Sequence, residues 1–479
     1  MDSFATETGA GRGGRTVTSH HSADAAFWLS GSDSTFILDE PVEPQHTLKV
    51  AVFDAESSRT FDYERVIDAL ARAVELLPQM RWRPQPVPFG LGRPAWTVDP
   101  GFDVRNHVHR TRVPEPGTKA QLCRKISELT SDPVPPGRPP WELWFLDGYE
   151  GGKVVAALKM NHALADGGRL VELLDLLTRP AAGVPPTAVP APAAPGPLSV
   201  AEALLSGAAE LAQQMGREVP RRVRTMLRGR GGAAAPRPPS MLRDQPKLPW
   251  RGPLTPGRSF SWVSVPLDDV KSIAHTISGT VNAVVFAVAA GAIRECLLAE
   301  GLPAERPVIA NVAAKVRGET DGRLWGTTAT SRTVALPTHI ADPLERLRES
   351  QAQTKAVRVS VDSRPVQREE WFDLAPAVML RPMLRFSRLI AQRVNGGVIV
   401  SNVTGPAEKR YIGPLGVENF ISCGHLKYIA GVNITVWSYA GLLNFAVYGC
   451  SRTMHDAEEF TARLEASFTE LRAAVGVST

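Results

Sequence analysis

The chain has 479 residues, a length that suits two domains better than one. Its apolar fraction of 43% and its charged fraction of 22% are those of an ordinary globular protein, and they exclude a fibrous or wholly disordered chain. The net charge is +5, and no run of about 18 apolar residues occurs, so the composition predicts no transmembrane helix. The N-terminus also lacks a basic segment followed by an apolar run, which argues against a secretory signal.

The four cysteines are far apart and form no Cys-x-x-Cys pair: Cys123, Cys296, Cys423 and Cys450. Their spacing predicts neither a zinc site nor a disulfide framework. We expect isolated thiols of the kind found in cytosolic proteins.

In chain order, residues 1–22 are rich in Gly, Ser and Thr and are expected to be disordered. Strand-like and helical patterns then alternate. Residues 46–53 and 153–160 are expected strands, and a helix is expected before Pro78, with Val66, Leu70, Ala73, Val74 and Leu77 on one stripe. A short helix is expected over 168–177.

The amino-acid composition changes at residue 180. A Pro/Ala-rich run over 180–198 is expected to be extended, and Ser199-x-x-Glu202 is a capping-box signature that opens a helix. The pattern predicts two α/β halves, 23–179 and 251–479, joined by a long linker over 180–250 that contains this one helix.

The linker ends in a strongly basic segment. Residues 217–251 contain ten basic and two acidic residues, a local charge of +8 that exceeds the net charge of the whole chain. A phospholipid surface or the phosphates of CoA would be suitable anionic partners. Nucleic acid is the weakest alternative, because no aromatic RNA-binding box or zinc finger is present. A solvated basic loop with no partner is an equally good interpretation.

The stretch "VVAALKMNHALADGGRLVELLDLL" places Asn-His-x-x-x-Asp-Gly between the second expected strand and the helix that follows it. A neutral imidazole at His162 can take a proton from a hydroxyl near neutral pH. Asp166 is expected to hold the loop, and Gly167 and Gly168 to allow a tight turn close to a ligand. A histidine near an apolar strand is more often purely structural, and Asp-Gly is a common turn, so the spacing alone leaves both interpretations open.

Several segments together resemble the bacterial wax ester synthase/diacylglycerol acyltransferase family of CoA-dependent acyltransferases. The Asn-His-x-x-x-Asp-Gly stretch resembles the family's HHxxxDG motif. "GRPPWELWFLDGYEGG" resembles its Pro-Leu-Trp segment, "TVNAVVFAVAAGAIREC" its Asn-Asp helix, and "VSNVTGP" its Asn-Val-Pro-Gly-Pro loop. The similarity covers most of residues 25–177 and 248–445 in the family's order.

The resemblance implies a two-domain chloramphenicol acetyltransferase-like α/β fold with a tunnel between the halves. It also implies acyl transfer from acyl-CoA, a co-substrate, to an alcohol, with His162 as the general base and Asp166 as the other catalytic-motif residue. It implies no metal and no permanently bound cofactor. A covalent acyl-enzyme is not expected either, because no G-x-S-x-G elbow is present.

Four positions depart from the family's motifs: Asn161, Pro140, Ala283 and Thr404. Residues 161 and 162 follow a strand and should point to opposite sides, so Asn161 is expected in the scaffold when His162 faces the site. Gly167 would support the motif. The substrate-binding candidates are Trp141, Asn282, Ser401, Asn402, Gly405 and Asn433. Asn282 could instead cap a helix, and Ser401, Asn402 and Asn433 could instead satisfy backbone groups.

Three hypotheses remain. The first is fatty acyl transfer to a hydrophobic alcohol, either a long-chain alcohol or a diacylglycerol, by a cytoplasmic enzyme of triacylglycerol or wax metabolism. The basic linker of this enzyme would attach peripherally to the inner membrane face or to lipid droplets. The second is acylation of a polar or secondary-metabolite acceptor, which the motif departures favour. The third is a catalytically silent acyl-CoA- or lipid-binding protein of the same fold.

Overall fold

A computed structural model describes residues 27–183, 196–213, 239–314, 325–327, 330–363, 375–391, 396–427, 430–454 and 456–477, with a few single residues between them. The predicted disorder of residues 1–22 and most of the Pro/Ala-rich and basic linker fall outside the described residues.

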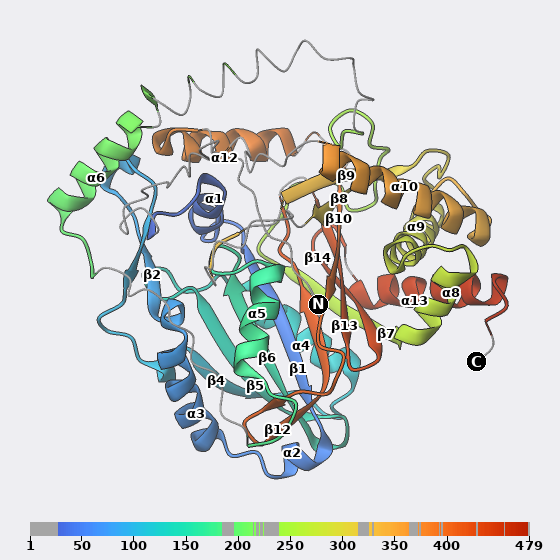
Figure 1. Ribbon diagram of the computed structural model, residues 1–479, viewed down its shortest axis with the longest axis horizontal. Coiled ribbons are helices and arrows are strands. Elements are labelled where there is room, and N and C mark those ends of the chain that lie inside the picture. Colours follow the sequence, from blue (N-terminus) through green and yellow to red (C-terminus); the bar gives the residue numbers. More distant parts are fainter. Residues whose placement is uncertain are drawn as a thin grey trace, which may run out of the picture.

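Two mixed six-stranded sheets form the frame (Figure 1). The first sheet has the order β11 (Tyr411–Ile412), β12 (Leu415–Cys423), β1 (His46–Phe53), β6 (Lys153–Asn161), β5 (Trp141–Tyr149), β4 (Val108–Arg112). The second has the order β7 (Arg258–Pro266), β14 (Leu442–Cys450), β13 (Val432–Tyr439), β10 (Val398–Thr404), β8 (Val308–Ala314), β9 (Thr330–Leu336). A separate ribbon pairs β2 (Trp82–Gln85) with β3 (Ala95–Val98).

Helices cover these sheets. In the N-terminal half they are α1 (Gly31–Asp39), α2 (Ala55–Arg59), α3 (Tyr63–Leu76), α4 (Lys119–Ser131) and α5 (Gly167–Leu177), with a one-turn 3₁₀ helix η3 (Pro88–Gly90). The linker helix is α6 (Val200–Gln213). In the C-terminal half they are α8 (Leu267–Thr276), α9 (Val281–Ala299), α10 (Pro343–Ser363), α12 (Ala377–Ala391) and α13 (Ala457–Ala474). The helices α8, α9, α10 and α13 lie together on the outer side of the second sheet (Figure 1).

Several sequence predictions are confirmed. The strand over 46–53 has the expected bounds, and the strand expected over 153–160 is β6, one residue longer. The helix before Pro78 is α3, and the helix expected over 168–177 begins one residue earlier as α5. The capping box is formed, because Glu202 N donates to Ser199 Oγ at 3.2 Å and Ser199 N donates to a Glu202 carboxylate oxygen at 2.8 Å. The cysteines are buried free thiols.

The two sheets do not divide where the linker divides the sequence. β11 and β12 come from the C-terminal half, yet they complete the first sheet, where β12 pairs antiparallel with β1. A core cluster also joins β1 and β6 to α4, β7 and β14, so apolar side chains of both halves share one core. The halves expected from the sequence are therefore fastened through a shared strand and a shared core.

Helix α9 is, among the described residues, the one helix long and apolar enough to span a membrane by length and composition. Its most apolar window is 72% buried inside the protein, because sequence-distant strands and helices of the C-terminal half pack around it. It is the central helix of the largest core cluster, as an all-round apolar helix in a large domain should be.

Candidate active site

The motif turn follows the last residue of β6. His162 N donates to Gln45 O at 3.2 Å, and Leu164 N donates to Asn161 O at 3.0 Å. The first bond joins the turn to the segment that enters β1, and the second closes the turn on itself. The backbone of His162 is therefore held from two sides while its side chain remains half-buried.

Asn161 lies in the scaffold behind the turn and is fully buried. Its amide nitrogen donates to Glu40 Oε2 at 2.9 Å and to Phe36 O at 3.2 Å, and its Oδ1 accepts from Ala163 N at 2.9 Å. One side chain thus ties β6 to the end of α1 and fixes the turn immediately after His162. This is the geometry expected when consecutive residues at a strand end point to opposite sides.

Glu40 holds this scaffold as a charged group. Its carboxylate also accepts from Val134 N at 3.0 Å, Gln45 N at 2.7 Å and His46 Nδ1 at 3.1 Å. Burial acts to raise the pKa of Glu40, but the hydrogen bond and charge of His46 and the backbone donors outweigh it, and the net shift is downward. Burial lowers the pKa of His46, although the hydrogen bond and charge of Glu40 act to raise it.

The ring of His162 is surrounded by three side chains from distant parts of the sequence. Its Nδ1 is 3.2 Å from Thr327 Oγ1. The Phe36 ring lies 4.7 Å from it, and the His425 ring 4.4 Å from it in an edge-on arrangement, both measured between ring centroids. When Nδ1 donates to Thr327, Nε2 carries the lone pair that a base needs.

His425 is a second imidazole beside His162, and it was not among the residues selected from the sequence. It is buried, and its Nε2 has no hydrogen-bond partner among the described residues. Burial, followed by the charge of His162 and then that of Lys427, lowers the pKa of His425 well below its usual value. His425 is therefore neutral at physiological pH and adds no positive charge beside His162.

Asp166 is the N-cap of α5, where its Oδ1 accepts from Arg169 N at 2.9 Å. A cap of this kind contributes about 1 kcal/mol and fixes the helix that follows the turn. Gly167 and Gly168 are the first residues of α5 and neither has a positive φ, so the predicted tight glycine turn is wrong. Gly167 instead allows close packing, because a Cβ there would lie 3.3 Å from the side chain of Val403 on β10.

A buried lysine adds charge beneath Asp166. Lys49 is fully surrounded on β1, and its Nζ donates to Ser422 Oγ at 2.7 Å. Burial lowers the pKa of Lys49 to about 8, while the charges of Cys423 and Asp166 act to raise it. Lys49 thus places a cation in the electrostatic field of Asp166.

Two of the binding candidates contact each other. Asn402 Nδ2 on β10 donates to Asn282 Oδ1 on α9 at 2.6 Å. The suggestion that Asn282 caps this helix is wrong, because the N-cap is Thr280, whose hydroxyl accepts from Ala283 N at 3.3 Å. Asn282 is instead exposed in the first turn, and its amide oxygen is turned toward β10.

Asn433 and Gly405 hold loops near the two sheets. Asn433 Nδ2 donates to His425 O at 2.8 Å, so this residue positions the segment that carries His425. Gly405 packs against Trp437 and Ser438 so closely that a Cβ would lie 2.3 Å from the backbone and indole atoms there. Both residues support the site through its framework.

Trp141 and Ser401 complete the candidate set. Trp141 is in the core, where its indole nitrogen donates to Met80 O at 2.7 Å and its ring stacks on His107. Ser401 is half-buried on β10 opposite Thr435 of β13. Neither residue contacts His162 through a hydrogen bond or a ring.

The residues that surround His162 were not visible in the sequence. Phe36, Thr327 and His425 lie 126, 165 and 263 positions away along the chain, and none belongs to a motif. His425 is one of ten histidines in the chain, and nothing in its local sequence distinguishes it. Among the residues selected from the sequence, Asn433 is the one that contacts His425 through a hydrogen bond in the described part of the chain.

The chain matches the model of the wax ester synthase/diacylglycerol acyltransferase catalytic domain over residues 29–285 and that of the family's C-terminal domain over residues 325–472. Two proteins of Mycobacterium tuberculosis H37Rv, provisionally named diacylglycerol O-acyltransferases, are each 30% identical to it. The two alignments cover 93% and 94% of this chain and 97% of each relative.

Solved structures show the same fold. The wax ester synthase/diacylglycerol acyltransferase of Marinobacter aquaeolei VT8 superposes with a TM-score of 0.66 at 21% identity, covering 94% of this chain and all of that one. The trichothecene 15-O-acetyltransferase of Fusarium sporotrichioides superposes with a TM-score of 0.57 at 11% identity, covering 94% of each chain. This confirms the predicted two-domain α/β acyltransferase fold. The chain belongs to the wax ester synthase/diacylglycerol acyltransferase family of acyl-CoA-dependent acyltransferases.

Proposed function

We propose that this enzyme transfers a fatty acyl group from acyl-CoA to the hydroxyl of a hydrophobic acceptor, a long-chain alcohol or a diacylglycerol, with His162 as the general base. The observation that carries the proposal is the placement of His162. It lies on a turn fastened by buried hydrogen bonds, with Nδ1 held by Thr327 and with rings packed against the imidazole.

The reaction needs one base and two bound substrates. His162 takes the proton of the acceptor hydroxyl while the oxygen attacks the thioester carbonyl carbon, and an oxyanion forms. The oxyanion collapses, the C–S bond breaks, and the CoA thiolate takes the proton from the imidazolium. The products are an ester and the free CoA thiol, and His162 returns to its neutral form.

The surroundings of His162 suit a hydrophobic acceptor. Phe36 and the neutral His425 present ring surfaces to it, and no positive charge is added by His425. Two of the positions that depart from the family's motifs belong to the framework. Ala283 is fully buried in α9, and Pro140 supplies a backbone acceptor to Asn161 N. Their substitution changes the support of the site and leaves His162 in place.

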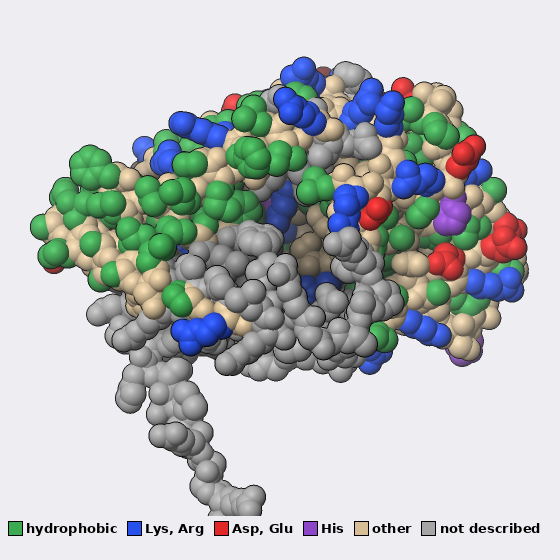
Figure 2. All heavy atoms as spheres, turned by 90° about the horizontal axis from the view of Figure 1, so that it is seen from above, with side chains coloured by type: hydrophobic (Ala, Val, Ile, Leu, Met, Phe, Trp, Pro, Cys, Tyr) green, Lys and Arg blue, Asp and Glu red, His purple; other side chains and the backbone are tan. Residues whose placement is uncertain are grey.

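Acyl-CoA is a co-substrate in this proposal, with no permanently bound cofactor. Figure 2 shows a hollow near the middle of the face seen from above, with Lys and Arg side chains in it. Such a position suits the phosphates of CoA and the mouth of the tunnel expected from the family resemblance. Asp166 contributes as the cap that fixes the helix after the catalytic turn.

We further propose that the enzyme is cytoplasmic and associates peripherally with the inner membrane face or with lipid droplets. The basic segment 217–251, with its local charge of +8, supports attraction to an anionic surface. A single electrostatic signal gives weak attachment, and a stable one requires an apolar contact as well.

The test is release of free thiol from palmitoyl-CoA by the purified full chain, with and without hexadecanol or a diacylglycerol. We expect release that depends on the acceptor and is abolished in His162→Ala. Binding of palmitoyl-CoA with no release from either acceptor would contradict the proposal and favour the silent binder. Release with small polar alcohols alone would favour the polar-acceptor hypothesis.

A further inference from the structure

An apolar surface lies on the outside of the N-terminal half, formed by η3, α6 and α12. Seven of the twelve large hydrophobic residues that are exposed in the described part of the chain belong to these three elements, so they are clustered and not scattered. We call this set the apolar face: Phe89, Val200, Leu205, Val378, Met379, Phe386 and Leu389. Figure 2 looks onto it, and hydrophobic side chains cover its left part with basic side chains along the edge.

The three elements are contiguous. Gly207 of α6 packs against the segment after η3 so closely that a Cβ there would lie 2.7 Å from Val87 and 3.0 Å from the backbone of Gly92. η3 in turn contacts α12, which contacts α1. Exposed apolar residues gathered on adjoining elements, rather than scattered singly, indicate an interaction site.

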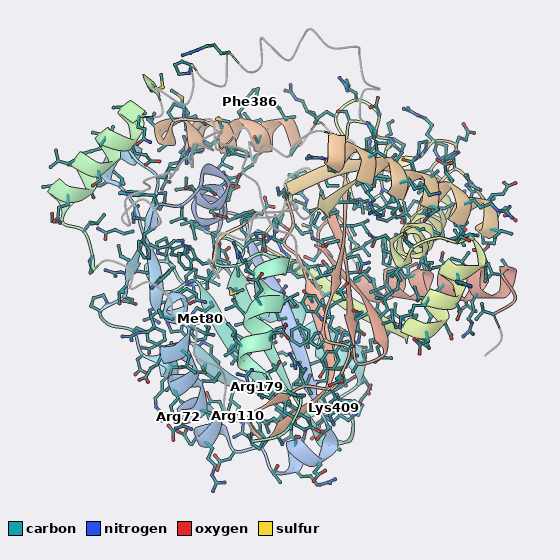
Figure 3. All side chains as sticks on the ribbon, in the orientation of Figure 1. Arg72, Met80, Arg110, Arg179, Phe386 and Lys409 are labelled. Carbon is teal, nitrogen blue, oxygen red and sulfur yellow. The ribbon has the colours of Figure 1, made fainter. Side chains whose placement is uncertain are left out.

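Helix α12 shows why this surface is apolar. Ala377, Leu380, Leu384 and Ala391 are buried and recur at helical spacing, which forms the inner stripe. Residues 378, 382, 386 and 389 form a second apolar stripe on the opposite side, and Phe386 lies on the outer side of the helix (Figure 3). The inner stripe is enough to pack α12 against the core of the protein. The outer, exposed stripe can therefore contact an apolar phase outside the protein.

The charged residues of α12 indicate which kind of apolar surface this helix contacts. Arg381, Arg385 and Arg388 fall between the two stripes, and the helix contains no acidic residue. Apolar side chains on the outer face and arginines along the flank are the pattern of a helix that lies in the interface of an anionic lipid surface. The exposed Arg381 and Arg385 would remain at the level of the phosphates while Phe386 and Leu389 enter the acyl region.

Phe89 adds an independent observation. It is 87% exposed and has a φ of 58°, a backbone conformation unfavourable for a bulky non-glycine residue. The chain therefore tolerates local strain in order to present a phenyl ring to the outside. An aromatic ring at such a tip is suited to insertion among lipid chains.

A cavity opens on this face. It has a volume of about 270 Å³ and lies between η3, α1 and α12, with walls that include Leu38, Val87, Phe89, Val378 and Leu380 and with Arg381 among its lining residues. Phe89 and Val378 belong both to the walls and to the exposed face. An alkyl chain that leaves the lipid surface would thus enter an apolar space with a cation beside it.

Helix α1 lies between this cavity and the catalytic histidine and contacts both. Leu38 faces the cavity, whereas Phe36, on the opposite side of the same helix, packs on the His162 ring. Arg388 of α12 forms an ion pair with Asp39, the last residue of α1, which is buried. The same short helix therefore contacts the docking helix, the cavity and the base.

We propose that the apolar face docks on an anionic phospholipid bilayer and that the cavity beneath it receives the alkyl chain of a lipid acceptor drawn from that bilayer. The proposal rests on the proposed function for the identity of the acceptor as a hydrophobic alcohol. Docking itself does not require turnover, so the two are tested separately.

Docking is tested by co-sedimentation of the full chain with vesicles of phosphatidylcholine, alone or mixed with phosphatidylglycerol. We expect binding to the mixed vesicles that weakens with salt. The double variant Phe386→Ser/Leu389→Ser should lose at least about 10-fold in partitioning, because both apolar side chains would leave water on docking. Arg381→Gln/Arg385→Gln should lose about 10-fold or more on the mixed vesicles, since two cations that face the anionic lipid headgroups are removed.

The matched control is Val42→Ser/Leu298→Ser, which removes two exposed apolar residues outside the apolar face. It should bind vesicles like the unmodified chain. Absence of binding by the unmodified chain, equal losses in control and face variants, or undiminished binding by the Phe386/Leu389 variant would overturn docking at this surface. Thiol release with a short water-soluble alcohol should be unchanged in that variant, which shows that it folds.

The cavity is tested by filling it. Leu38→Trp, at a cavity wall outside the apolar face, should leave vesicle binding intact and lower thiol release with vesicle-borne hexadecanol relative to the short alcohol by about 10-fold or more. An unchanged ratio of the two rates would overturn the assignment of the cavity to the acceptor chain. If no acceptor supports release in the unmodified chain, the proposed function fails, and the vesicle binding result still decides the docking proposal.

Discussion

The catalytic turn and the apolar face lie on opposite sides of α1 and are built in opposite ways. Around the turn, Asn161 and Glu40 are buried and engaged in hydrogen bonds to backbone and side chains on all sides. On the apolar face, large side chains such as Phe89 and Phe386 are mostly exposed. One region is fixed by polar contacts inside the protein, and the other offers apolar contacts to something outside it.

The difference shows how the two tasks make different demands. A general base works only when its nitrogen is held at the right distance from a bound hydroxyl, and small displacements cost large factors in rate. Association with a fluid lipid surface needs apolar area and charge, and it tolerates imprecise geometry. Substitutions around the turn should therefore affect rate strongly, and those on the apolar face should affect substrate access.

The largest effect is expected at the turn itself. His162→Ala should lower kcat/KM by about 10²–10⁴-fold, because it removes the base and leaves binding of both substrates in place. The matched substitution Asn161→His should retain substantial activity, since an imidazole can replace the donor and acceptor of the amide in the scaffold. The measurement is thiol release under identical acceptor concentrations. Equal losses from the two substitutions would remove the distinction between base and support.

His425 tests whether the ring that packs on His162 is needed to position the base. His425→Ala should lower kcat by roughly 10- to 100-fold, since the ring edge that confines the His162 imidazole is lost. His425→Phe should restore most of the rate, because Nε2 of His425 bonds to nothing in the described part of the chain and the ring is what contacts His162. The exposed His275 supplies the control, His275→Ala, with no expected change. Equal rates in the Ala and Phe variants would contradict a positioning role.

A smaller effect is expected at Thr327. Thr327→Val removes the hydroxyl 3.2 Å from His162 Nδ1 and should lower kcat about 3- to 10-fold, the range of one neutral hydrogen bond. Thr327→Ser keeps the hydroxyl and should retain the rate. The comparison of the two variants separates the hydrogen bond from the methyl group, and identical losses would show that the bond to Nδ1 does not orient the base.

The smallest effect concerns stability near the end of α1. Burial raises the pKa of Glu43 to about 7 from an ordinary 4.5, so the folded state favours its protonated form. That contribution is complete below about pH 4.5 and is lost as the pH rises through 7, where the protein carries a buried charge. Glu43→Gln should therefore increase the free energy of unfolding by about 1–3 kcal/mol at pH 8 and by little at pH 4.

Urea unfolding at the two pH values checks this prediction, with Glu75→Gln as a control at an exposed position of α3. A gain of the same size at pH 4 and pH 8 would indicate a packing effect and would contradict a buried carboxyl that titrates near neutrality.

The sequence was sufficient for the local features of the fold. The strand over 46–53, helix α5 and the capping box at Ser199 follow from periodicity and cap chemistry, which act over a few residues. The exchange of β11 and β12 into the first sheet was not predicted, because strand pairing between residues hundreds of positions apart leaves no pattern in either segment.

The site was predictable to the same local extent. His162, Asp166 and Asn161 are close in sequence and form one turn, so the pattern could identify them together. The glycines after Asp166 were assigned to a turn, whereas they begin a helix, because a missing side chain serves close packing as well as positive φ. The wall around His162 is made by Phe36, Thr327 and His425, and only the folded chain brings these residues together.

The central claim is that the His162 imidazole takes the proton of the acceptor. Its most direct test is rescue of His162→Gly by free imidazole in the palmitoyl-CoA and hexadecanol assay. We expect a loss of at least about 100-fold. Added imidazole should restore part of the acceptor-dependent thiol release, and the rescue should increase as the pH rises through the pKa of imidazole and its neutral form accumulates. A variant that retains a rate near that of the unmodified enzyme, or a lost rate that imidazole restores independently of pH, would contradict His162 as the base.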